Sequence, residues 1–207
     1  MILIICVFNV NFAYAHEIYY NGSTPISLKW NYVTGSTVNM KMSDDLLEAP
    51  FTGHYSVART AWPNALANAS TRVSITDTSL SNSNIDLATA DSDYWEDRWG
   101  VLGALDTLGV CDITSTDGIQ IDSAADALAS SKLIRYAGIL FNPSSSVYDN
   151  NTNIRYVMVH EIGHALGLGH PNTKHNPTSV ASVMRTGEPL NYYNPQTHDI
   201  NDMNFKY

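Results

Sequence analysis

The sequence predicts a domain of the α/β or α+β class, in which a sheet packs against helices. Stretches with strand-like patterns recur through the first two thirds of the chain, with a helical pattern between them. A long helical pattern follows the last of these stretches. The chain has 207 residues, of which 44% are hydrophobic, and this suits one compact core.

The first half of the chain is expected to begin with a strand over Ile26–Trp30, where apolar and polar residues alternate. A helix is expected over 55–66, although Pro63 should kink or split it. Its apolar face consists of Tyr55, Ala58, Trp62 and Leu66. Val73–Ile75 is a short strand candidate, and 77–93 are predicted to form a polar surface loop.

The second half is expected to contain one strand and two helices. Leu133–Phe141 is the strand candidate, and a polar loop over 144–153 follows it. The next helix has apolar residues three and four positions apart, namely Ile154, Val157, Met158, Ile162, Ala165 and Leu166. Asn151, Thr152 and Asn153 are its N-cap candidates. A last helix is expected to begin after Thr197 as its N-cap, with Ile200, Met203 and Tyr207 on one face.

The first of these two helices carries the most specific motif of the chain, H-E-x-x-H-x-x-G-x-x-H over 160–170. His160 and His164 project from one helical face and can hold one Zn²⁺, while Glu161 can act as general base on water. Gly167 can adopt the left-handed conformation that ends a helix, so that His170 returns to the same ion. Three histidines leave a coordination position open, as in a catalytic zinc site. The competing interpretation is an amphipathic core helix with incidental histidines.

The motif resembles that of the metzincin zinc peptidases, in particular the matrixins. Two later stretches resemble the same family. Ser182–Arg185 is similar to the Met-turn, whose methionine, here Met184, lies beneath the zinc, and 195–203 is similar to the start of the C-terminal helix. The resemblance implies a metzincin fold: a mainly parallel twisted sheet packed on helices, with a small C-terminal subdomain after the zinc-binding helix.

The domain organisation begins with an apolar stretch over 1–15 that ends in Ala13-Tyr14-Ala15. It reads as a secretory signal peptide, so we expect a secreted, extracellular protein that starts near His16. The stretch is too short for a membrane anchor. The catalytic domain is expected over 16–207, with an N-terminal subdomain over 16–169 and a C-terminal subdomain over 170–207. Loss of Cys6 with the signal would leave Cys111 without a disulfide partner.

The charge balance bears on partners and metals. The formal net charge is −9 with no basic run, so nucleic-acid binding has no electrostatic support. Calcium is possible, because Asp112, Asp117, Asp122, Asp126 and Asp149 supply carboxylates, but no EF-hand spacing occurs. No histidine lies between His54 and His160, so the second, structural zinc of animal matrixins is not expected. We expect a monomer with one catalytic Zn²⁺.

The sequence thus predicts a secreted zinc endopeptidase that cleaves protein or peptide substrates, with His160, His164 and His170 as metal ligands and Glu161 as catalytic base. One alternative is a non-catalytic zinc-containing binding module derived from a peptidase, although such a module has no need of Glu161. A zinc hydrolase that acts on a non-peptide bond is a third possibility.

Overall fold

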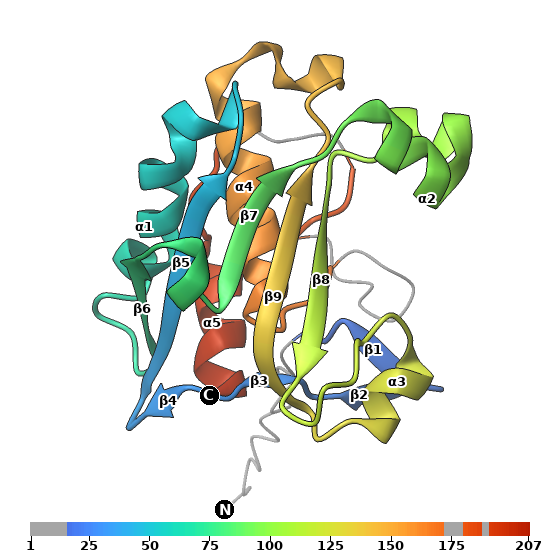
Figure 1. Ribbon diagram of the computed structural model, residues 1–207. Coiled ribbons are helices and arrows are strands. Elements are labelled where there is room, and N and C mark those ends of the chain that lie inside the picture. The colour runs from blue at the N-terminus through green and yellow to red at the C-terminus, as the bar shows by residue number, and fades with distance from the viewer. Residues whose placement is uncertain (1–15, 172–179, 188–190) are drawn as a thin grey trace, which may run out of the picture.

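The computed structural model describes residues 16–171, 180–187 and 191–207, and its main feature is a twisted, mostly parallel sheet (Figure 1). Four parallel strands lie in the order β6 (Arg72–Asp77), β5 (Thr37–Leu46), β7 (Ile85–Thr89) and β9 (Leu133–Phe141). The strand β8 (Gly109–Ser115) is antiparallel to β9 and forms the edge of the sheet.

Four short strands complete the sheet structure. The strand β3 (Lys29–Trp30) extends the sheet beside β9, and β4 (Val33–Thr34) pairs with β5. A separate hairpin consists of β1 (Tyr19–Asn21) and β2 (Thr24–Ile26).

The helices α1 (Tyr55–Ala65) and α4 (Asn151–Ala165) pack against each other, and α4 crosses behind β7 and β9 in Figure 1. The helix α5 (Thr197–Lys206) lies below α4, whereas α2 (Ser92–Asp106) and α3 (Ala124–Ala129) lie near the two ends of β8. Three single 3₁₀ turns occur at Phe51–His54, Leu80–Asn82 and Ser146–Asp149. Among the described helices, none combines the length and the apolar character that crossing a bilayer requires.

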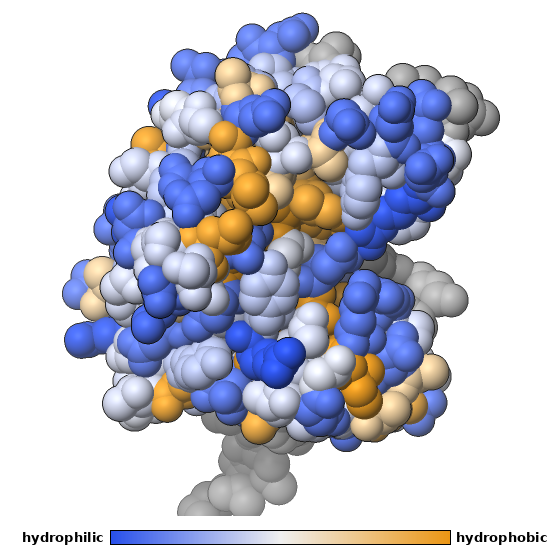
Figure 2. Space-filling model, viewed as in Figure 1, coloured by the Kyte–Doolittle hydropathy of each residue, from blue (hydrophilic) through white to orange (hydrophobic). Residues whose placement is uncertain are grey.

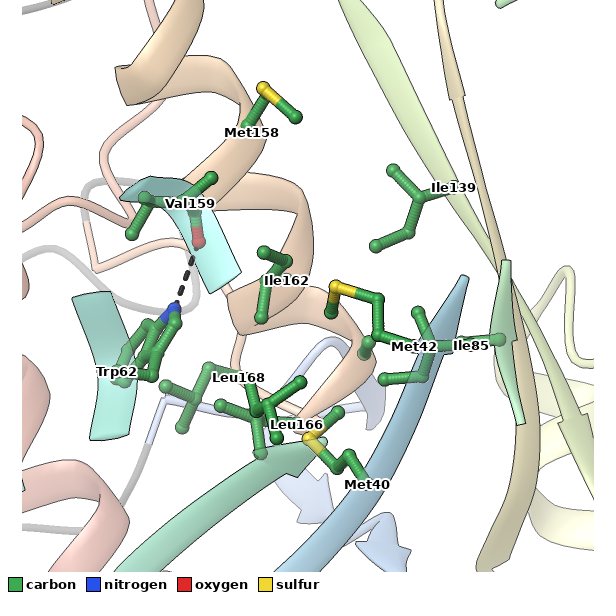
Figure 3. Packing of buried hydrophobic residues seen from close by; sticks show 14 of the residues in the cluster. Met40, Met42, Trp62, Ile85, Ile139, Met158, Val159, Ile162, Leu166 and Leu168 are labelled. Atoms are coloured by element: carbon green, nitrogen blue, oxygen red, sulfur yellow. Dashed lines mark hydrogen bonds between the residues drawn. The ribbon is translucent and has the colours of Figure 1, made fainter. Parts of the chain in front are cut away.

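The core between the sheet and α4 fixes the position of that helix. Figure 3 shows Met42, Ile85 and Ile139 from the sheet facing Ile162 of α4 and Leu166, the C-cap of that helix, and all five are fully buried. The indole Nε1 of Trp62 in α1 donates a hydrogen bond of 2.9 Å to the carbonyl oxygen of Val159. Figure 2 shows the opposite face of the sheet, whose surface is hollowed at the right edge between the lobes that carry α2 and α3.

Several predicted elements are confirmed. The strand over Leu133–Phe141 has the predicted bounds, and β6 contains Val73–Ile75. The predicted mixed fold with a mainly parallel sheet is confirmed as well. The helix α1 is not split at Pro63, because this residue lies in its last turn and the helix ends two residues later, at Ala65.

Other predictions are wrong for identifiable reasons. The polar loop predicted over 77–93 contains β7, in which only Ile85 and Leu87 are fully buried, with Asp86 between them, and a mostly polar stretch precedes the strand. The strand expected over Ile26–Trp30 is divided between β2 and β3. The helix α4 begins earlier than predicted, because Asn150 caps it by accepting a hydrogen bond from the backbone N–H of Asn153.

The last helix, α5, has its predicted place but a different cap. Gln196, not Thr197, is the N-cap, and the Asp199 side chain accepts from the backbone N–H of Gln196. Met203 is fully buried, and Ile200 and Tyr207 pack against the core as the apolar spacing predicted.

Candidate metal centre

Three histidine side chains converge at the C-terminal end of α4. His160 and His164 project from one face of the helix, which then ends in a Schellman motif: Gly167 has φ +82°, and the N–H of Leu168 donates to the carbonyl oxygen of Gly163. This reversal returns His170 to the helix. The Nε2 atoms of His160 and His164 lie 3.1 Å apart, and the Nε2 of His170 lies 3.1 Å from the first and 3.0 Å from the second.

Backbone carbonyl groups set the tautomers of two of these rings. The Nδ1 of His160 donates to the carbonyl oxygen of Val183 at 2.8 Å, and the Nδ1 of His164 donates to that of Leu168 at 2.7 Å. In a neutral ring the Nε2 atom then carries a lone pair. The Nε2 lone pairs of these rings therefore lie about 3 Å from one another and from the Nε2 of His170. Lone pairs so close together repel one another unless they surround a cation. In a tetrahedral Zn²⁺ site with bonds of ~2.0 Å, the ligand atoms lie about 3.3 Å apart, which is close to the separations of these nitrogens.

The electrostatics of the three rings suit the same cation. Burial, with the neighbouring histidines as a second cause, lowers the pKa of His160 to about 3 and that of His170 to about 2. Burial lowers the pKa of His164 to about 4. All three rings are therefore neutral at physiological pH, which is the form that binds metals.

Glu161 lies beside the histidines with an unsatisfied carboxylate. It is 5% exposed, and its Oε2 has no hydrogen-bond partner within the described residues. Burial, followed by the charge of Asp112, raises its pKa to about 8. Gly109 of β8 leaves room for this side chain, since a Cβ there would lie 3.1 Å from its Oε1. A buried carboxylate without a partner costs stability, and such costs mark functional sites.

The histidines and Glu161 lie in a cavity of ≈ 730 Å³ between β8 and α4. One wall is formed by Leu108, Gly109 and Val110, and the other includes Arg185 and Thr186. Cys111 also lines the cavity, and burial raises the pKa of its thiol well above the usual value. The thiol therefore stays protonated and is not a nucleophile.

The predicted Met-turn lies against α4, the helix that carries His160 and His164. Met184 is 2% exposed and lies against Gly163, where a Cβ would collide with its Sδ and with the indole of Trp62. The turn is held by Asp199 of α5, whose carboxylate accepts from the Ser182 hydroxyl and, at 2.9 Å, from the Val183 N–H.

Sequence reasoning missed Asp199, although its place three residues after a helix N-cap was a signal. It also missed the carbonyl groups of Val183 and Leu168, which no side-chain pattern reveals.

The aspartates that the sequence offered for calcium do not form a cluster in the described residues. Two groups of at least three metal-capable side chains occur in the described ranges, and neither contains any of the aspartates considered for calcium. Asp112 instead forms a bidentate ion pair with Arg98, and Asp126 accepts the Ser123 hydroxyl at the start of α3. Calcium thus gains no support.

A known protein family matches most of the chain. A sequence model described as Matrixin matches residues 48–204. Among solved structures, that of myroilysin is similar, with 13% identity, coverage of 94% of this chain and 90% of that chain, and a TM-score of 0.44. No curated protein matches the chain significantly. Because the family match spans more than half of the chain and includes the motif of 160–170 and the turn at Met184, the protein belongs to the matrixin family of metallopeptidases.

Proposed function

We propose that the protein is a secreted zinc-dependent endopeptidase in which Glu161 is the general base. The observation that carries this proposal is the unpartnered, buried carboxylate of Glu161 beside three converging histidine nitrogens in an open cavity. A site that only holds a metal for stability has no use for such a carboxylate, because it lowers the stability of the fold.

The metal of this family is zinc, and His160, His164 and His170 would hold it. When bound, the ion polarises a carbonyl group, acidifies a water molecule, and by its charge favours the ionised form of Glu161. Glu161 accepts the proton of the attacking water and passes it to the amine that leaves. The hydrogen bonds from His160 and His164 to backbone carbonyl groups keep both rings oriented throughout.

The strand β8 supports a polypeptide substrate. It is an edge strand whose only strand partner in the described part of the sheet is β9, and its residues Gly109–Cys111 line the cavity. The edge of β8 at Gly109–Cys111 offers backbone donors and acceptors to an extended peptide, whereas its edge at Ile113–Ser115 is bonded to the backbone of Ile119 and Ile121. A peptide bound there lies alongside α4, so its backbone passes the histidines and Glu161.

Cleavage of a mixed peptide library tests the activity. We expect cleavage that stops with a chelator and returns with Zn²⁺, and that falls by at least ~10³-fold in Glu161→Ala while the bound zinc remains. Glu96→Ala, which changes an exposed glutamate of α2, is the matched control and should cleave normally. Undiminished cleavage by Glu161→Ala would show that the general base is another group. Bound zinc without any cleavage would favour the non-catalytic binding module instead.

Secretion rests on the apolar stretch over 1–15 alone, which lies outside the described residues. Expression of the full chain in a secreting host, followed by N-terminal sequencing of protein from the medium, tests it. We expect His16 as the first residue. Retention of the whole protein in the cell would contradict secretion.

A further inference from the structure

A second group of metal-binding side chains lies outside the catalytic cavity. His16 precedes β1, whereas His198 and Asp202 lie one turn apart on α5. The Nδ1 of His16 is 2.8 Å from the Oδ2 of Asp202 and 2.9 Å from the Nε2 of His198. The Nε2 of His198 is 3.5 Å from the same carboxylate oxygen. We call these three residues the terminal cluster.

Protons alone leave one short contact of the terminal cluster without a full hydrogen bond. The Nδ1 of His16 can either donate its proton to Asp202 or accept one from His198, because it carries a proton or a lone pair but not both. One proton or one lone pair cannot form two linear hydrogen bonds at once, so only one of the two contacts, 2.8 Å with Asp202 and 2.9 Å with His198, can be a full hydrogen bond. A cation at the centre satisfies all three atoms at once.

The donors also fit a specific class of ion. Two imidazole nitrogens and one carboxylate oxygen suit Zn²⁺ and similar divalent transition metals. Their separations of 2.8 to 3.5 Å bracket the 3.0 to 3.1 Å found between the three ring nitrogens of the catalytic histidines. We propose that His16, His198 and Asp202 bind a second divalent transition-metal ion, with Zn²⁺ as the physiological candidate.

The surroundings indicate a structural role for this ion. The terminal cluster does not line the catalytic cavity, and the side chains of His16 and Asp202 are only 10% and 8% exposed. His198 is 24% exposed, which leaves a path for the ion from solvent. The carboxylate of the neighbouring Glu17 is already paired with Lys206, so it does not compete for the ion.

The ion would tie the start of the domain to α5, next to the catalytic histidines. The carbonyl oxygen of His16 accepts a hydrogen bond of 2.6 Å from the N–H of Gly169, and Glu17 pairs with Leu168 in an isolated β-bridge. A Cβ at Gly169 would collide with the backbone of Glu17, so the two segments touch. The terminal cluster therefore supports the segment from which His170 projects.

Metal content tests the proposal on purified protein that retains His16. After equilibration with excess Zn²⁺ and desalting, elemental analysis should find two zinc ions per wild-type chain. His198→Ala and Asp202→Asn should each retain one. Asn201→Ala is the matched control, because Asn201 is an exposed residue of the same helix, and it should retain two. One zinc per wild-type chain at saturation would overturn the proposal and identify the terminal cluster as hydrogen-bonded only.

A second variant keeps the test independent of how His198→Ala folds. The double variant His164→Ala with His170→Ala removes two of the three catalytic histidines and should still bind one zinc. Loss of all zinc from this folded variant would also overturn the proposal.

Thermal unfolding gives a further measure. At a zinc concentration about 100-fold above the dissociation constant of the terminal cluster, His198→Ala should melt roughly 5–10 °C below wild type. The two proteins should melt together in chelator. An equal difference in zinc and in chelator would show that no ion binds there. These measurements do not use peptidase activity, so their failure would leave the proposed function untouched.

Discussion

The catalytic histidines and the terminal cluster have similar donor spacings but opposite surroundings. His160, His164 and His170 come from eleven consecutive positions and open into a cavity of ≈ 730 Å³. The terminal cluster joins His16 to two residues of α5 and lies outside that cavity. Only the first group has a free carboxylate, that of Glu161, beside it. The difference teaches that donor geometry indicates a metal, whereas the cavity and the unpaired base indicate catalysis.

The largest contrast between the two groups is expected in activity. His164→Ala removes a ligand of the catalytic ion and should lower kcat/KM for a peptide by at least ~10³-fold. His198→Ala removes a ligand of the terminal cluster and should lower it by less than about tenfold, since it acts through the segment of His170. Peptide hydrolysis at saturating zinc measures both. Equal losses would show that the two groups form a single functional unit.

Acid should destabilise the catalytic group in the metal-free protein. The pKa values of His160, His164 and His170 are lowered from 6.5 to between about 2 and 4, so the folded state binds fewer protons than the unfolded state. Stability is therefore fully present above pH 6.5 and falls as the pH decreases towards these values.

Thermal unfolding in chelator from pH 7 to pH 4 measures this dependence. His170→Gln, which lacks one of the three rings, should show a weaker pH dependence than wild type. The same slope in both proteins would contradict the role of this ring.

Overpacking between α4 and the turn at Met184 should lower stability by a smaller amount. Gly163→Ala places a methyl group against Met184 and Trp62 and should cost about 1–3 kcal/mol. Gly53→Ala is the control, because a Cβ there has no neighbour within 4 Å and the residue is exposed. Denaturant unfolding of both variants gives the difference. No loss in Gly163→Ala would mean that Met184 and Trp62 shift to make room for the added methyl group.

A change of similar size but opposite sign, a gain of stability, should accompany a loss of activity. Glu161→Gln removes a buried charge without a partner and should stabilise the metal-free protein at pH 9 by about 1–3 kcal/mol. The sign follows from the raised pKa of about 8: the stability contributed by the protonated carboxyl group is lost as the pH rises through that value. The gain should therefore be smaller at pH 6. Unfolding in chelator at both pH values measures it.

The sequence allowed prediction of what is local in the chain. The motif of 160–170 could be recognised because helical spacing and one glycine turn bring its histidines together. Leu133–Phe141 was recognisable because strongly apolar residues fill the strand. In contrast, β5 was not predicted, although Val38, Met40 and Met42 alternate as its buried face. That signal was present in the chain and was overlooked.

The remaining features depend on contacts between distant segments. The strand β7 has only two core residues and follows a stretch rich in serines and asparagines, and its place between β5 and β9 makes it a strand. The terminal cluster requires His16 and His198, which are 182 positions apart. No periodic pattern in a sequence links residues at such a separation, so the cluster can be recognised only in the folded structure.

The hydrogen bonds of Asp199 also determine when the catalytic centre is completed during synthesis. The helix α4 emerges from the ribosome before α5, because chains are made from the N-terminus. Until α5 has emerged, the N–H of Val183 has no carboxylate to bind, and the carbonyl group that orients His160 belongs to an unanchored turn. Glu161 and the three histidines therefore reach their final arrangement only after α5 has docked on the turn at Met184.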